Sequence, residues 1–172
     1  ADQRRLLIEV APKGVLKDFS AQWQGSFPDV SSYQIKGQFF NLEMQPQKAQ
    51  LARAKTAKLA AKAAVPAIPG FDNLSGTIDA NDHGGRISLD SSDLLLQTPS
   101  YFVDPVMPFK RLQMRAKWTL QEENQLLFEI DELQFQQDET KGSVQGSHRI
   151  SLQGGDLGVV DLTAQVNRFD LK

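Results

Sequence analysis

Residues 111–120, Arg-Leu-Gln-Met-Arg-Ala-Lys-Trp-Thr-Leu, alternate strictly between polar and apolar side chains. Successive side chains of a β-strand point to opposite faces of a sheet, so this stretch predicts a strand with one dry and one wet face. Sheets with one apolar and one solvated face are typical of antiparallel strands. The dry side chains of this stretch are Leu112, Met114, Ala116, Trp118 and Leu120.

Similar alternation recurs through most of the chain. It predicts strands at 4–10, 14–24, 32–44, 74–81, 86–97, 109–120, 125–137, 141–153 and 158–171. Short polar runs rich in Asn, Asp, Glu and Gly separate several of these strands and favour hairpin turns. Long strands joined in this way favour an extended, curved sheet over a compact sandwich. We therefore expect a mainly β fold, a long, bent antiparallel sheet of repeated hairpins that forms a groove.

In four of these stretches the alternation slips by one residue and then resumes. The slips follow the apolar residues Phe39, Leu89, Ile130 and Val166. A slip sends every later side chain to the wrong face unless a β-bulge absorbs the extra residue. We therefore predict bulges at Phe40–Asn41, Asp90–Ser92, Asp131–Glu132 and Asn167–Arg168. Units of roughly forty residues that repeat a bent hairpin indicate a repetitive architecture, which serves a surface more often than a catalytic pocket.

The chain has 172 residues, a formal net charge of −2 and no cysteine. This length predicts a single β-rich domain over residues 1–172, or a fragment of a repeating β-groove. No run approaches the roughly 18 apolar residues of a membrane-spanning helix. The opening Ala-Asp-Gln-Arg-Arg is not a signal peptide, and we expect the sequence to begin inside a longer protein. The slightly negative charge argues against nucleic acid as a partner.

One segment departs from the strand pattern. Residues 46–64 are rich in alanine and lysine and begin with a proline, which predicts a helical insertion. A basic stripe on this helix contains Lys48, Lys55, Lys58 and Lys62. The stripe suits anionic lipid headgroups or an acidic partner. Because large apolar residues are few, we favour the alternative of a solvated helix that rests its alanine face on the sheet.

Two proline-rich stretches, 65–71 and 99–109, predict crossovers or edge coverings, because proline has no backbone N–H for a strand ladder. The second stretch also contains several aromatic and aliphatic residues. Such a segment suits the end of a hydrophobic groove or a contact with lipid. We favour the simpler interpretation that its aromatic rings pack in an ordinary core.

Catalytic signals are weak, and we expect no enzyme activity, no cofactor and no metal site. His83 in a predicted turn and His148 on a predicted strand have no Ser, Asp or Cys at the spacing of a nucleophilic site. Residues 79–90 loosely resemble a calcium loop, but His83 occupies its fifth position and the segment joins two predicted strands rather than two helices. A hairpin turn accounts for this segment better.

Several motifs in a fixed order resemble one known family. Residues 10–19, Val-Ala-Pro-Lys-Gly-Val-Leu-Lys-Asp-Phe, are followed by Trp23. The most specific motif is Pro-Gly-Phe-Asp-Asn-Leu-Ser-Gly at 69–76, and residues 85–91, 102–105 and Trp118 continue the order. Across about residues 5–140 the chain resembles the large AsmA-like proteins of the YhdP type. The alanine- and lysine-rich helix is not part of this pattern.

The resemblance implies an envelope protein of Gram-negative bacteria that is anchored in the inner membrane and extends through the periplasm. It further implies an apolar β-sheet groove that carries phospholipid between the inner and outer membranes, and it transfers no catalytic residues. The resemblance also implies a role in outer-membrane biogenesis. The implied β-sheet groove agrees with the long sheet that alternation alone predicts.

We therefore expect a periplasmic lipid-handling module whose dry face shelters acyl chains and whose parent protein contacts the membrane. The expected lipid-facing residues are Leu112, Met114, Trp118, Leu120, Phe128, Ile130, Leu133 and Phe135. The alternative is a structural or scaffolding β module of the cell envelope that binds no ligand and whose dry face is simply its core. An open edge strand would also allow self-association.

Overall fold

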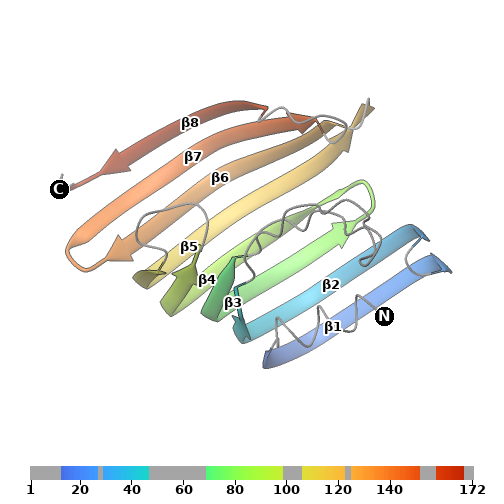
Figure 1. Cartoon of the computed structure of the whole chain (residues 1–172), viewed down its shortest axis with the longest axis horizontal. Coiled ribbons are helices and arrows are strands. Elements are labelled where there is room, and N and C mark those ends of the chain that lie inside the picture. The colour runs from blue at the N-terminus through green and yellow to red at the C-terminus, as the bar shows by residue number, and fades with distance from the viewer. Residues whose placement is uncertain are drawn as a thin grey trace, which may run out of the picture.

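The computed structural model describes residues 13–26, 29–46, 69–98, 106–122, 125–151 and 158–168. Within these residues eight strands form a single sheet (Figure 1). The strands are β1 (Lys13–Ser26), β2 (Asp29–Met44), β3 (Gly70–Asn81), β4 (Gly84–Gln97), β5 (Val106–Gln121), β6 (Gln125–Gln137), β7 (Thr140–Ser151) and β8 (Val159–Val166). The described part of the chain contains no α-helix.

The strands follow one another across the sheet in sequence order, and all neighbouring pairs are antiparallel. This confirms the predicted antiparallel sheet of repeated hairpins, and Figure 1 shows that the strands share a common bend. Strands β1 and β8 form the two edges. At the β3–β4 turn, the Asn81 Oδ1 accepts hydrogen bonds from the backbone N–H groups of His83 and Gly84 at 2.9 and 3.1 Å. The segment that loosely resembles a calcium loop is therefore a hairpin.

The strand predictions that lie between residues 14 and 153 are confirmed, although some bounds differ. Strands β3 and β5 begin earlier than predicted because Gly70 and Val106 both pair with Gln97 of β4. The predicted strand at 4–10 and residues 47–64 of the predicted helix lie outside the described residues, as do most of the two proline-rich stretches. The basic stripe of Lys48, Lys55, Lys58 and Lys62 falls among them.

Each of the first four strands contains one Asn or Asp with a positive φ angle. The angles are 49° at Asp18, 48° at Asn41, 65° at Asn73 and 51° at Asp93. Asn and Asp adopt this left-handed conformation more readily than other residues with a side chain, because their short polar groups bond locally. Each of the four lies where the pairing of neighbouring strands shifts its register. These residues therefore form bulges that bend the strands.

Two of the four predicted bulges are confirmed, and a third lies one residue from its predicted position. The slip at Phe40–Asn41 is confirmed, and β6 shifts its register between Ile130 and Leu133, as predicted. In β4 the bulge is centred on Asp93, one residue beyond the predicted Asp90–Ser92, because an aspartate accepts the left-handed conformation there.

The bulge predicted at Asn167–Arg168 lies beyond β8, which ends at Val166, and residues 169–171, where the strand was expected to resume, lie outside the described residues. The Asn167 Oδ1 accepts a hydrogen bond from the backbone N–H of Lys141 at 2.6 Å, and its Nδ2 donates to the carbonyl oxygen of Glu139 at 3.3 Å. The backbone N–H of Asn167 also donates to the carbonyl oxygen of Lys141 at 2.9 Å, so the side-chain amide reinforces the backbone pairing at this end of β8.

A short chain of hydrogen bonds joins β2, β3 and β4 at their bulges. Ser75 donates its backbone N–H to the Ser91 Oγ at 2.9 Å, and the Ser91 hydroxyl donates to the Ser75 carbonyl oxygen at 3.2 Å. The Ser75 Oγ accepts the backbone N–H of Asn41 at 3.0 Å. Ser91 is fully buried. Its hydroxyl therefore replaces ladder hydrogen bonds that the register shift removes from Ser75.

Candidate functional site

The antiparallel register places apolar side chains in rows that run across the strands on one face of the sheet. The first row crosses all eight strands and contains Ala21, Ile35, Ala80, Gly85, Trp118, Phe128, His148 and Val160. The second runs from β2 to β8 through Gly37, Ile78, Ile87, Ala116, Ile130, Gly146 and Leu162. The third again crosses all eight strands, through Leu16, Phe39, Gly76, Leu89, Met114, Leu133, Val144 and Ala164.

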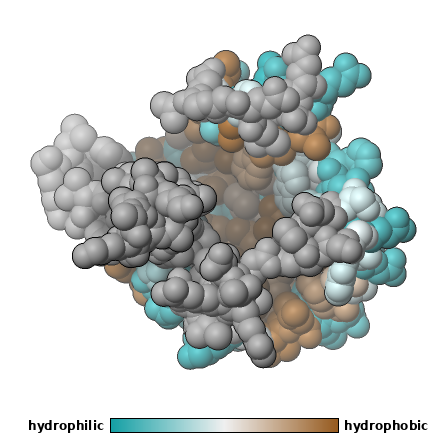
Figure 2. All heavy atoms as spheres, turned by 45° about the vertical axis from the view of Figure 1, so that its right-hand side comes forward, coloured by the Kyte–Doolittle hydropathy of each residue, from teal (hydrophilic) through white to brown (hydrophobic). Residues whose placement is uncertain are grey.

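Beyond the bulges the rows resume on the same face, which we call the apolar face. One row contains Ser91, Leu112, Phe135, Gly142 and Val166, and another contains Met44, Phe71, Leu96 and Met107. The Phe109 and Phe135 rings meet edge to face, with centroids 6.0 Å apart. Figure 2 shows brown, hydrophobic side chains gathered in a central hollow, with teal, hydrophilic side chains toward the outside.

Burial on the apolar face changes from the middle of the sheet to its edges. Ala116 in β5 keeps only 3% of its surface exposed, whereas Trp23 in β1 keeps 65% and Leu162 in β8 keeps 51%. No second sheet packs on either face within the described residues. Both edge strands thus present large apolar side chains beside a well-packed centre.

The eight residues expected to face lipid all lie on this surface. Direct cross-strand pairing joins Met114 to Leu133, Trp118 to Phe128, and Leu112 to Phe135. Ile130 pairs with Ala116, and Leu120 pairs with Leu126. Sequence reasoning restricted these candidates to β5 and β6, but the register extends the same rows over the other six strands. The signal that could have found the rest is the alternation in each predicted strand, aligned hairpin by hairpin.

Glycines belong to the apolar face, and aromatic rings of neighbouring strands lie over them. A Cβ atom added to Gly85 would lie 2.6 Å from the Trp118 Cζ2 and 2.7 Å from the Ala80 Cβ. A Cβ atom on Gly142 would lie 2.5 Å from the Phe135 Cζ. These positions admit no side chain, so the rings can lie flat along the sheet. Rings over strand glycines are a known means of stabilising a curved sheet.

The opposite, polar face carries cross-strand ion pairs. Arg111 donates from Nη2 to both carboxylate oxygens of Asp90 at 2.8 and 3.1 Å, and Arg115 pairs with Glu132. Lys36 lies 3.5 Å from Asp79, and Lys117 lies 3.5 Å from Glu129. These side chains are substantially exposed to solvent, which limits the stabilisation that each pair provides.

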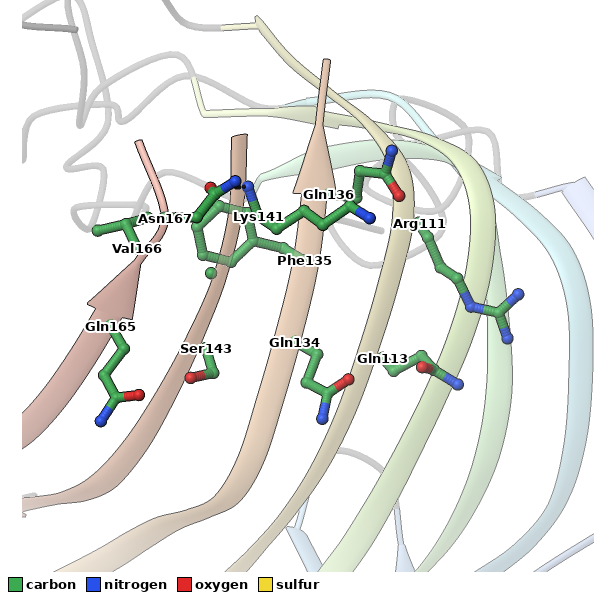
Figure 3. Close-up of a pocket in the computed structure, with 11 residues that line it drawn as sticks. Arg111, Gln113, Gln134, Phe135, Gln136, Lys141, Ser143, Gln165, Val166 and Asn167 are labelled. Carbon is green, nitrogen blue, oxygen red and sulfur yellow. Dashed lines mark hydrogen bonds between the residues drawn. The ribbon is translucent and has the colours of Figure 1, made fainter. Parts of the chain in front are cut away.

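A row of uncharged polar side chains also crosses the polar face. Figure 3 shows Gln113, Gln134, Ser143 and Gln165 in a line over β5 to β8, in the order that the register requires. They line part of a shallow depression of about 510 Å³. These groups offer hydrogen bonds but include no pair of nucleophile and base.

Neither histidine belongs to a catalytic cluster in the described residues. His83 lies in the β3–β4 turn beside Asp82, 3.1 Å away, and His148 lies in the first apolar row between Phe128 and Val160. The described residues contain no group of His, Asp or Glu that could hold a metal ion. Among the same residues no helix is long and apolar enough to cross a membrane.

Comparison with known proteins identifies one family. The family model described as YhdP protein matches the chain over residues 1–172, which is its whole length. No curated protein and no solved structure shows a significant match.

Proposed function

The chain belongs to the YhdP protein family, and on that premise we propose that its apolar face shelters the acyl chains of phospholipids during their passage between the inner and outer membranes. The observation that carries this proposal is the set of apolar rows that cross the sheet inside one hollow (Figure 2). We place the module in the periplasm, as part of a protein anchored in the inner membrane. Its partners are phospholipid and, through the rest of that protein, the membrane.

The energy of such binding comes from removing hydrocarbon from water. Each methylene group that leaves water contributes about 0.8 kcal/mol to the free energy of binding, and this contribution does not depend on the orientation of the contact. The third apolar row offers Leu, Phe, Met, Val or small side chains on every strand and no charge. Non-directional contacts with such side chains hold an acyl chain on the sheet without fixing it at one strand.

Movement follows from the direction of the rows. Neighbouring strands lie about 4.8 Å apart, so an acyl chain that shifts from one strand to the next exchanges one aliphatic contact for a similar one. Such a path contains no strongly favoured position at which a lipid would stop. The proposed mechanism is therefore passive and contains no chemical step.

Native mass spectrometry of protein purified after mild extraction tests this function. We expect co-purified phospholipid on the unmodified protein and its loss in Met114→Asp, which introduces a carboxylate into the third row. The matched control is Ser88→Asp, an exposed position on the polar face that pairs with Arg115 of the neighbouring strand. This control should keep its lipid.

The alternative is a scaffold whose apolar face is only a core, and the same experiment separates the two. Repeated lipid-free spectra of the unmodified protein would contradict the proposed function. Thermal unfolding of Met114→Asp provides a second criterion, because Met114 is only partly buried. An open groove predicts a modest loss of stability at this position, whereas a sealed core predicts that the variant unfolds, since it buries an unpaired charge.

A further inference from the structure

The apolar face differs between its two rims, which are the two ends of its strands. We call Trp rim the end that holds Trp23 paired with Tyr33, and Trp118 and His148 in the first row. We call Met rim the opposite end, which holds the row of Met44, Phe71, Leu96 and Met107, with Phe109 beside it. In Figure 1 the Trp rim is the right-hand end of the sheet, where β1, β3, β5 and β7 end.

The two rims differ in their hydrogen-bond donors, although Leu120 and Leu126 also lie at the Trp rim. Tryptophan and tyrosine combine an apolar ring with one N–H or O–H donor, and a histidine ring also carries an N–H. Such rings are enriched where hydrocarbon meets water, with the ring in one phase and the polar atom in the other. Met, Phe and Leu carry no strong donor. Among the described residues of the apolar face, the Trp, Tyr and His side chains all lie at the Trp rim.

The length of the strands agrees with this division. At about 3.3 Å per residue, the separation of four positions from Trp118 to Met114 spans roughly 13 Å, and that of eleven positions from Trp118 to Met107 spans roughly 36 Å. One leaflet of a bilayer holds about 15 Å of hydrocarbon, half of the usual core. A lipid with its head at the Trp rim would therefore end its acyl chains near Met114 and Leu112. Leu112 is among the most buried residues of the face.

We propose that a bound amphiphile lies parallel to the strands in one orientation. Its hydrogen-bond-accepting head lies at the Trp rim, and its acyl chains point toward the Met rim. The chemical class that fits is a glycerophospholipid, whose ester and phosphate oxygens accept hydrogen bonds from the indole and phenol donors. This inference rests on the proposed function and adds the orientation of the ligand. One rim of the groove then faces the aqueous phase and the other adjoins hydrocarbon.

Fluorescence quenching tests the orientation in the unmodified protein, because Trp23 and Trp118 are its two tryptophans and both lie at the Trp rim. The probes are phosphatidylcholines that carry a nitroxide on the headgroup or near the methyl end of one acyl chain. We expect the headgroup label to cause the larger loss of fluorescence. An equal loss, or a larger loss with the methyl-end label, would overturn the orientation and leave lipid binding itself intact.

A second variant moves the fluorescent tryptophan to the Met rim. In a chain with Trp23→Phe and Trp118→Phe, Phe109→Trp places a single indole near the Met rim. The order of quenching should reverse, with the methyl-end label now the stronger; an unchanged order contradicts the proposal. If this variant fails to fold, the measurement on the unmodified protein still decides. No quenching by either label, together with lipid-free mass spectra, would overturn the proposed function and this inference with it.

Discussion

The apolar and polar faces are built from the same eight strands but by different kinds of contact. On the polar face, particular partners meet, such as Arg111 with Asp90 and Arg115 with Glu132. On the apolar face, the second row consists only of aliphatic and small side chains, whose neighbours are interchangeable in chemistry. The polar contacts favour one pairing of strands, because a changed register would separate the charges. The apolar contacts remove hydrocarbon from water and, under the proposed function, form the surface on which acyl chains move.

This contrast predicts that equal changes have unequal effects on the two faces. A charge placed on the apolar face should damage both the fold and lipid binding, and the size of the damage should follow burial. A charge removed from the polar face should alter stability slightly and leave lipid binding unchanged. Several positions of the sheet allow this contrast to be measured against a matched control.

The largest effect is expected for Leu112→Asp. Leu112 keeps 8% of its surface exposed and pairs with Phe135, so the new carboxylate would be buried without a partner. An uncompensated buried charge costs about 3–5 kcal/mol, which would unfold most of the protein. Chemical denaturation measures this loss. Thr119→Asp, at an exposed position of the same strand, is the control, and a similar loss in both variants would show that the two faces do not differ.

A smaller loss is expected for Gly85→Ala. The added methyl group would lie 2.6 Å from the Trp118 Cζ2 and 2.9 Å from the Ala80 Cα, and overpacking of this kind costs about 2 kcal/mol. Replacing Trp118 by Leu in the same chain should recover part of the loss, because the ring no longer occupies the site. A double-mutant cycle measures this coupling, and strictly additive effects would show that the ring does not lie on the glycine.

Alternation in the sequence was sufficient for the sheet, but bulges were predictable only where clearly alternating runs flank the slip on both sides. The slips at Asn41 and after Ile130 interrupt such runs. The bulges at Asp18 and Asn73 were missed, because in β1 and β3 the residues before and after them do not form a clear alternation. Asn and Asp adopt a positive φ angle more readily than other residues with a side chain, which makes Asp18 and Asn73 candidates for such bulges.

The residues of the apolar face were predictable only in part, for a different physical reason. Large residues such as Met114 and Phe128 identify themselves by hydrophobicity. Gly85 and Gly142 share the alternation of this face, but they are not hydrophobic, and only the register shows that a ring from the neighbouring strand lies over each of them. The difference between the Trp and Met rims likewise depends on how strands far apart in sequence align, since Trp23 and Trp118 are separated by three strands.

An intermediate effect is expected for Ser91→Ala at the bulges of β3 and β4. The variant removes the hydroxyl that bonds both the N–H and the carbonyl oxygen of Ser75, and unsatisfied buried groups cost about 1.5 kcal/mol. The adjacent Ser92→Ala, exposed on the polar face, should be nearly neutral. Hydrogen exchange at the Ser75 amide provides a local readout: protection should fall in Ser91→Ala only, and unchanged protection would show that the hydroxyl is not its partner.

The smallest effect is expected on the polar face, for the pair of Arg115 and Glu132. Their side chains keep 66% and 42% of their surface exposed, so a double-mutant cycle with Arg115→Ala and Glu132→Ala should give a coupling energy below about 1 kcal/mol. The coupling should weaken further as salt screens the charges. Co-purified phospholipid should be the same in all four proteins of the cycle. A coupling of several kcal/mol, or a loss of lipid in these variants, would show that the polar face shares the role assigned to the apolar rows.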